Sequence, residues 1–116
     1  MPVELGTRQA LALWHAALVA GVRDEGPDLT ARQLALLLSV YLDPAPHTVR
    51  GLAATLKVSK PAVTRALDRL GQLGLLRRRR DEADRRNVLV ERTVKGSVFL
   101  NDLGERIVRA ARELPP

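Results

Sequence analysis

The sequence of 116 residues contains no cysteine. This absence excludes disulfide bonds, metal sites with thiolate ligands and redox sensing by thiols. Histidine is scarce as well, because only His15 and His47 are present, and neither has a carboxylate at a spacing typical of a metal site or a catalytic triad. A glycine-rich phosphate-binding loop is also missing. We therefore predict that the protein is not an enzyme and that it holds neither a metal ion nor another cofactor.

Long apolar runs are missing too. The longest run, ALALWHAALVAGV, covers residues 10–22 and is shorter than the about 20 apolar residues that a membrane-spanning helix needs. The first residues lack the basic and apolar regions of a signal peptide. Because the lack of cysteine also fits a reducing compartment, we predict a cytoplasmic protein that does not bind membranes.

The positive charge of the chain is concentrated in one region. The formal net charge is +6, but residues 47–95 contain 13 Lys/Arg and 5 Asp/Glu, a balance of +8, and the remainder contains 6 and 8, a balance of −2. A charge localised in this way indicates a face that binds a polyanion on a nearly neutral body. A generally solubilising surface is the alternative.

Capping and stop signals divide the chain into helices and one hairpin. Thr30 and Gln33 form a capping box, and Thr48, Ser59 and Thr93 are further candidate N-caps. The glycine at position 71 or 74 ends the fourth helix, with position 74 favoured as the residue just beyond it. The predicted helices cover residues 7–23, 31–42, 49–57, 60–74 and 94–113, and the predicted strands cover residues 75–80 and 87–93.

Residues 49–76 show the pattern of a helix-turn-helix, with apolar inner faces on two short helices and a tight turn between them. The outer face of the second helix carries short polar groups and cations near its start, where a recognition helix meets base edges. Arg65 is suited to guanine, Thr64 to a thymine methyl or a phosphate, and Lys60 to a phosphate. An ordinary amphipathic hairpin with a solvated outer face is the alternative.

Six of the ten residues 77–86 are arginine, and strand-forming residues bracket them. Two strands with a polar tip directly after a recognition helix describe a winged helix, whose wing can reach a neighbouring minor groove. Arg85 and Arg86 fall at the tip, and Asp84 is placed to orient an arginine through a bidentate pair. A disordered basic tag is the alternative.

Side chains alternate along a strand, so the four consecutive arginines cannot all face DNA. Arg77 and Arg79 share one face, and Arg78 and Arg80 share the other. The pair on the core side must extend its charges to water or pair with a carboxylate of the tip, at position 81, 82 or 84. About half of the run is therefore expected to bind DNA and half to support the hairpin.

In pattern and order these residues resemble the MarR family of winged-helix transcriptional regulators. The resemblance runs from about Leu29 to Phe99, and its most specific parts are VTRALDRLGQLGLLRR and the wing element Asp84-Arg85-Arg86. It implies a homodimer on a pseudo-palindromic operator, with a recognition helix in each major groove and Arg86, supported by Asp84, in the minor groove. The expected DNA-binding residues are Ser59, Lys60, Pro61, Thr64, Arg65, Arg69, Arg77, Arg79, Arg85 and Arg86, with Asp84 as the orienting carboxylate.

The resemblance also implies that the first and last helices form the dimer interface. Independently, residues 7–23 are apolar nearly all round, which leaves a second side for another subunit. The chain is shorter than is usual in the family, with one helix after the wing where two are common and Arg92-Thr93 in place of Leu-Thr, so we expect a smaller or differently arranged interface. The expected interface residues are Leu11, Trp14, Leu18, Leu100, Leu103 and Ile107.

Many members of the family bind phenolic or other small effectors in a cleft between the dimer helices and the DNA-binding lobe. Trp14, His15, Tyr41 and His47 are the candidates for such a cleft in this sequence. The alternative is that the two aromatic residues belong to the core or the interface and that the histidines face solvent.

We therefore predict a mainly α fold with a small β-hairpin, a winged helix-turn-helix of order ααααββα. Residues 1–116 form a single domain, in which residues 30–93 make the DNA-binding lobe and helices 7–23 and 94–113 serve dimerisation. The predicted function is sequence-specific regulation of transcription by a homodimer bound to double-stranded DNA, with a small-molecule effector as a possible further partner. A protein-interaction module and a non-specific nucleic-acid-binding protein are the alternatives.

Overall fold

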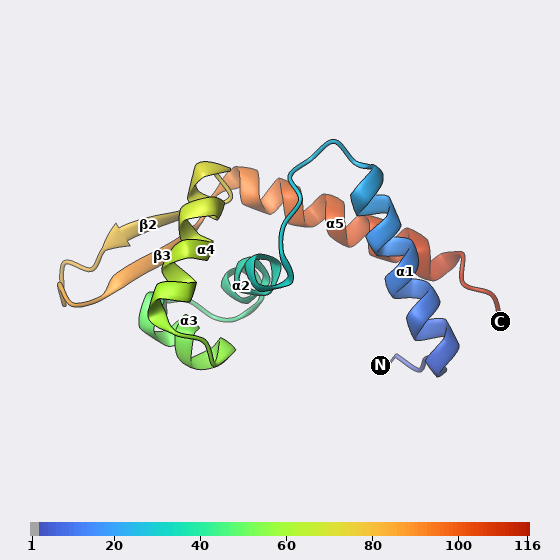
Figure 1. The fold of residues 1–116 in the computed structure, drawn as a ribbon, viewed down its shortest axis with the longest axis horizontal. Coiled ribbons are helices and arrows are strands. Elements are labelled where there is room, and N and C mark those ends of the chain that lie inside the picture. Colours follow the sequence, from blue (N-terminus) through green and yellow to red (C-terminus); the bar gives the residue numbers. More distant parts are fainter. Residues whose placement is uncertain (1–2) are drawn as a thin grey trace. The chain divides into compact units, whose positions relative to one another are not determined.

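The computed structural model describes residues 3–116, and its elements follow the predicted order with one addition. The chain forms two compact units, one made of Leu29–Phe99 and the other of the segments before and after it. The last helix therefore begins in one unit and ends in the other. The elements are α1 (Thr7–Arg23), α2 (Ala31–Leu42), β1 (His47–Thr48), α3 (Val49–Leu56), α4 (Lys60–Gln72), β2 (Leu76–Arg80), β3 (Val88–Arg92) and α5 (Val94–Arg112) (Figure 1).

The predicted capping residues begin the helices of the unit Leu29–Phe99. The Thr30 hydroxyl accepts from the Gln33 N–H at 3.1 Å, and the Gln33 side chain accepts from the Thr30 N–H at 2.9 Å, which completes the capping box of α2. The hydroxyls of Thr48 and Ser59 accept from backbone N–H groups in the first turns of α3 and α4. These bonds satisfy donors that a helix start leaves unpaired.

Two positions with left-handed backbone fix α4 between its neighbours in the chain. Lys57, with φ 54°, ends α3 and turns the chain into α4. At the other end of α4, Gly74 has φ +75°, its N–H bonds to the Gly71 carbonyl, and the Leu75 N–H bonds to the Leu70 carbonyl. This is a Schellman motif, for which glycine is the preferred residue. The chain passes from it directly into β2.

The sheet has three antiparallel strands in the order β1-β3-β2, so the prediction of a two-stranded hairpin was incomplete. The missing strand, β1, pairs His47 with Val90 and Thr48 with Leu89. Two residues are too few to show the alternation of a strand. Thr48 moreover serves as the N-cap of α3, and this was the stronger local signal.

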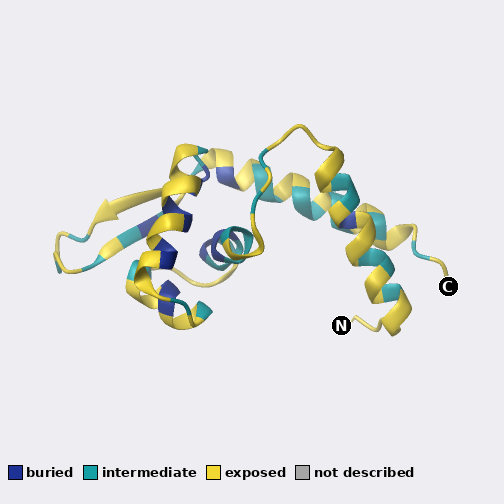
Figure 2. Ribbon diagram, viewed as in Figure 1, coloured by how far each residue is buried: buried dark blue, intermediate teal, exposed yellow. Residues whose placement is uncertain are grey.

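The core of this unit lies where α2, α3, α4 and the sheet meet. Figure 2 shows the buried residues on the inner sides of α2 and α4, while the outer side of α4 is exposed. Burial of one apolar face therefore fixes which side of α4 faces outward. The largest fully buried side chains are Leu36, Leu37, Val40, Val63, Leu67, Leu70 and Leu75.

A hydrogen-bonded junction around Tyr41 joins α2, the end of α4 and the start of α5. The Tyr41 hydroxyl lies 2.8 Å from the Thr93 carbonyl and 3.2 Å from the Leu75 carbonyl, and it accepts from the Thr93 N–H at 3.0 Å. The Thr93 hydroxyl donates to the Gly74 carbonyl and accepts from the Gly96 N–H, which confirms Thr93 as the cap of α5. Gly96 is buried against this junction.

In the other unit, α1 packs on the C-terminal part of α5. Ala17 is buried, and Arg106 forms an ion pair with Asp24 at 3.1 Å. A stripe on α1 remains uncovered, with exposed fractions of 66% for Leu11, 58% for Trp14 and 51% for Leu18. Among the helices of residues 3–116, none is both long and apolar enough to cross a membrane.

Candidate nucleic-acid interface

The outward face of α4 carries the side chains that the sequence predicted for base and phosphate contacts. Lys60 and Thr64 lie one helical turn apart, as do Arg65 and Arg69, and all four are exposed. The Ser59 hydroxyl is used as the N-cap, and the exposed Pro61 lies in the first turn. The helix thus presents a row of exposed hydrogen-bonding groups and cations.

Beside this face lies a hollow between the start of α3, α4 and the wing, which we call the basic cleft. Its described lining includes four cationic residues and no carboxylate, and its volume is about 260 Å³. A concave surface lined by one sign of charge concentrates its potential and attracts phosphates. The lining residues are Val49, Arg50, Lys60, Thr64, Arg78, Arg86, Asn87 and Val88.

At the tip of the wing, Asp84 holds Arg86 in a two-point pair, as predicted. Arg86 Nε lies 3.0 Å from Asp84 Oδ1, and Arg86 Nη2 lies 3.1 Å from Asp84 Oδ2. The bonds from the side chain and the backbone N–H of Arg86, and more weakly the charge of Arg50, hold the pKa of Asp84 below its usual value. The Arg86 side chain is 80% exposed, so its guanidinium is oriented and still accessible.

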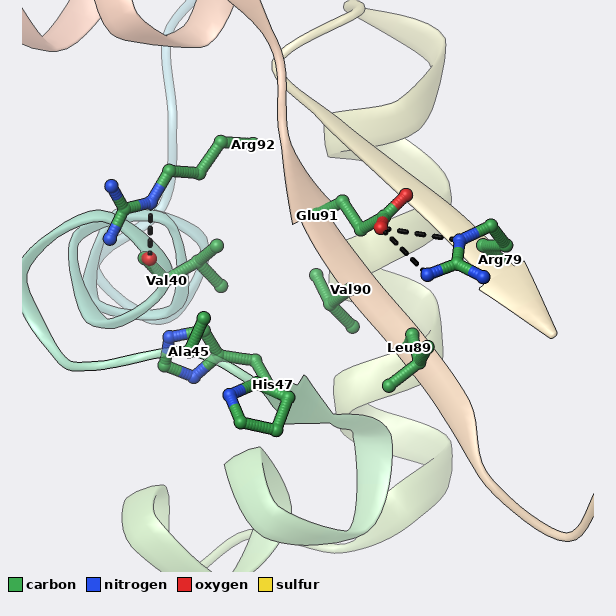
Figure 3. A pocket seen from close by; sticks show the side chains of 9 residues that line it. Val40, Ala45, His47, Arg79, Leu89, Val90, Glu91 and Arg92 are labelled. Carbon is green, nitrogen blue, oxygen red and sulfur yellow. Dashed lines mark hydrogen bonds and ion pairs between the residues drawn. The ribbon is translucent and has the colours of Figure 1, made fainter. Parts of the chain in front are cut away.

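Glu91, on the neighbouring strand, holds Arg77 and Arg79. Arg79 donates to Glu91 at 3.1 and 3.2 Å (Figure 3). Arg77 donates to the same carboxylate at 3.4 Å, on the face of the sheet opposite the buried Leu76. The hydrogen bond from Arg79, followed by the charges of both arginines, lowers the pKa of Glu91.

On the other face of β2, Arg78 reaches α4 and pairs with Asp68 at 2.7 Å. The core-side arginines were expected to extend to water or to pair with a carboxylate of the tip. Both are exposed, but the carboxylate that pairs with Arg78 belongs to α4 and not to the tip. The Asp81 carboxylate instead accepts from the Ala83 N–H within the turn. The register of the strands and the packing of α4 decide these partners, and neither can be derived from local sequence. The disordered-tag alternative also fails, because residues 76–80 form a paired strand.

The basic cleft contains two arginines that were not predicted to lie at the interface. Arg50 follows the N-cap of α3 by two positions, and only the packing of α3 beside the wing brings it near Arg86. Arg78 was assigned to the opposite face from Arg77 and Arg79, but its place beside Lys60 and Thr64 depends on the tertiary fold.

A second hollow of about 400 Å³ lies between α2, the segment before β1 and β3 (Figure 3). Of the four residues suggested for an effector cleft, His47 lines this hollow, whereas the Tyr41 hydroxyl is engaged in the junction described above. Trp14 and His15 are exposed on α1, in the other unit. Arg92 forms one wall, where its Nε donates to the Val40 carbonyl and its guanidinium lies 5.6 Å from the centre of the Tyr41 ring.

Comparisons with known proteins agree with this arrangement. Residues 17–87 match the model of the MarR family. The chain is 32% identical over 88 residues to the HTH-type transcriptional regulator PecS of Dickeya dadantii; the match covers 74% of this chain and 53% of PecS, so the chain spans about half the length of this curated relative.

Solved structures show the same fold. A mutant of MarR from E. coli complexed with operator DNA is 26% identical, with a TM-score of 0.68, and the match covers 91% of this chain and 70% of that one. The transcriptional regulator BldR from Sulfolobus solfataricus is 28% identical, with a TM-score of 0.65 and coverage of 91% and 73%. Both chains are thus similar to this one over nearly all of its length.

Proposed function

The chain belongs to the MarR family of winged helix-turn-helix transcriptional regulators, and from this premise we propose that it binds operator DNA in a sequence-specific manner as a homodimer. Membership of a family of regulators agrees with the prediction that it is not an enzyme. The relative from E. coli, crystallised with operator DNA, supports DNA as the partner. A regulator of this kind acts in the cytoplasm, where the DNA is.

One observation carries the proposal, namely that exposed cations gather on the outward face of α4, in the adjoining basic cleft and on the wing. The start of α4 would enter the major groove, with Arg65 at a guanine and Lys60 at a phosphate. Arg86 would enter the neighbouring minor groove, whose narrow regions have a strongly negative potential. Its pair with Asp84 orients the guanidinium before DNA arrives, so less side-chain entropy is lost on binding.

We propose a set of DNA-contacting arginines that differs from the set expected from the sequence. Arg77 and Arg79 already share Glu91 on the face of the wing away from α4, so we propose that they do not contact DNA. Arg50, which lines the basic cleft and has no ion pair in the described chain, joins the set in their place. Arg69 and Arg85 remain candidates for phosphate contacts because both are exposed beside this surface.

The homodimer is supported by the uncovered apolar stripe of α1. Leu11, Trp14 and Leu18 are each more than half exposed, and a second copy would remove this apolar surface from water. The half-buried residues Leu100, Leu103 and Ile107 of α5 belong to the same unit and are proposed to complete the interface. Such a dimer would place two recognition helices on half-sites about one helical turn apart.

The hollow beside His47 is our candidate for an effector site. Its volume of about 400 Å³ falls within the range of small-molecule sites, and it combines apolar walls from Val40, Pro46 and Leu89 with polar groups from Arg92 and His47. A saturable change in the NMR signals of these residues on addition of a ligand that also releases DNA would support the assignment.

A variant with two substitutions in the wing distinguishes the proposed DNA binding from the alternative function, that of a protein-interaction module. Replacement of Arg85 and Arg86 by alanine should abolish DNA affinity at physiological salt and leave a protein partner bound, because the wing makes no apolar docking surface at these positions. Fluorescence anisotropy with labelled duplexes measures the first effect. Unchanged DNA affinity in this variant would contradict the proposal.

A non-specific nucleic-acid-binding protein is distinguished by comparing duplexes. It would lose affinity steeply with salt and show no preference between sequences.

A further inference from the structure

Asp68 is the one acidic residue of α4, and it lies on the exposed face of the helix among cations. Under the proposed function, a carboxylate at this place would be unfavourable, because it would repel the phosphates of a bound duplex. Its oxygen Oδ1 accepts from Arg78 Nη2 at 2.7 Å, the shortest ion pair within residues 3–116. The carboxylate therefore has a specific partner on the wing.

Stability does not explain this pair well. The side chains of Asp68 and Arg78 are 54% and 37% exposed, and ion pairs this accessible to water contribute little to folding. The position of the pair points to another role. The pair connects α4 to β2 across the turn at Gly74, and Arg78 also lines the basic cleft. Asp68 thus determines where one of the four cations of the cleft points.

We propose that Asp68 is a positioning residue for operator recognition, which holds Arg78 against α4 and prevents its guanidinium from gripping phosphates of any sequence. This inference rests on the proposed function. Phosphate contacts add affinity without sequence information, so a released Arg78 would favour every duplex about equally and lower the ratio of specific to non-specific binding. Arg86 is different, because the carboxylate that holds it leaves its side chain 80% exposed.

The test compares Asp68→Asn with a matched loss of one negative charge, Glu82→Gln. Glu82 is exposed at the wing tip and forms no ion pair within the described residues. Fluorescence anisotropy gives the affinity of each full-length variant for an operator duplex, obtained by selection from random DNA, and for a scrambled duplex, between 50 and 200 mM salt. Circular dichroism verifies that each variant is folded.

For Asp68→Asn we expect tighter binding to the scrambled duplex, a smaller ratio of operator to scrambled affinity, and a salt dependence steeper by one phosphate contact. One contact adds about 0.9 to the slope, which corresponds to an about 3.5-fold larger loss of affinity over this salt range. Glu82→Gln should leave the ratio within about twofold of wild type, because its charge is screened. The double variant Asp68→Asn with Arg78→Gln should return the scrambled affinity and the slope to wild-type values, which a purely structural role of Asp68 would not produce.

The inference would be overturned if Asp68→Asn left the ratio of operator to scrambled affinity unchanged. It would also be overturned if Glu82→Gln changed this ratio equally, because Asp68 would then act only through its charge. A smaller ratio caused only by weaker operator binding would also overturn it. If the wild type does not discriminate between the duplexes, the proposed function fails together with the inference. If it discriminates and the variants behave alike, only the inference fails.

Discussion

Replacement of Gly96 by alanine should destabilise the protein strongly, because the new methyl group has no room. A Cβ atom at this position would overlap the Tyr41 hydroxyl and the Leu75 carbonyl oxygen. Neither atom can move freely. The Tyr41 hydroxyl is held by the N–H and the carbonyl of Thr93, and the Leu75 carbonyl belongs to the segment that leads from α4 into β2. The substitution must therefore displace the junction between α2, the recognition helix and α5.

The expected loss has two parts. Overpacking of a well-packed site costs about 1–3 kcal/mol, and the loss of a hydrogen bond from the Tyr41 hydroxyl adds about 1 kcal/mol. A total of about 2–4 kcal/mol should lower the Tm by roughly 8–16 °C, at about 4 °C per kcal/mol for a chain of this size. Thermal unfolding followed by circular dichroism, at one protein concentration, measures this shift.

Gly71→Ala is the matched control. Gly71 lies in the last turn of α4, and a Cβ there would meet nothing within 4 Å. Alanine should therefore stabilise the protein by about 0.5–1 kcal/mol through its higher helix propensity. Adding Tyr41→Phe to Gly96→Ala removes one of the two overlaps, so the double variant should lose at least about 1 kcal/mol less than the sum of the single variants. A Gly96→Ala variant as stable as wild type would refute this packing.

Four further predictions concern the interface and the dimer. Arg86→Gln should weaken operator binding roughly 10- to 150-fold, the value of a charge-assisted hydrogen bond. Arg79→Gln should change the affinity less than about threefold at 150 mM salt. Equal effects of the two substitutions in anisotropy titrations would contradict the proposal that Arg86 contacts DNA and Arg79 does not. Arg65→Ala should cost about 1–3 kcal/mol at the operator and relax preference at one base pair, and a uniform loss on all sequences would make it a phosphate contact instead. Since Arg86 lowers the pKa of Asp84 from its usual 3.8, their pair contributes fully above that pH and is lost as the pH falls through the lowered value; carboxyl NMR titration should show a higher pKa in Arg86→Gln, and an unchanged one would exclude the pair in solution. Leu11→Asp should yield monomers in sedimentation experiments and weaken operator binding, and a variant that sediments as a dimer would place the interface elsewhere.

Features determined by neighbouring residues were predictable from the sequence. The capping box of Thr30 and Gln33, the N-cap Ser59 and the glycine at position 74 each depend on contacts within a few residues, and the structure confirms all of them. The pair of Asp84 and Arg86 is local for the same reason, because the partners are only two positions apart in the sequence. Such signals sufficed for the order of the main elements and for the outward face of α4.

Features determined by packing were not predictable in the same way. Arg78 finds Asp68 because α4 lies against the sheet, and Arg79 finds Glu91 because the register brings the two strands together. Each arginine had nearer carboxylates in the sequence, but the turn uses one of them for its own backbone. The short strand β1 was not predicted, because Thr48 also caps α3 and this capping role has a clearer local pattern.

The most direct test of the central claim is selection of random duplex DNA by the purified protein at about 150 mM salt, followed by sequencing. A dimeric regulator with a recognition helix on each subunit should enrich an inverted repeat whose half-sites lie roughly one helical turn apart. Measurable binding without enrichment of any sequence would contradict the claim, because the arginines of α4 and the wing would then contact only the phosphate backbone.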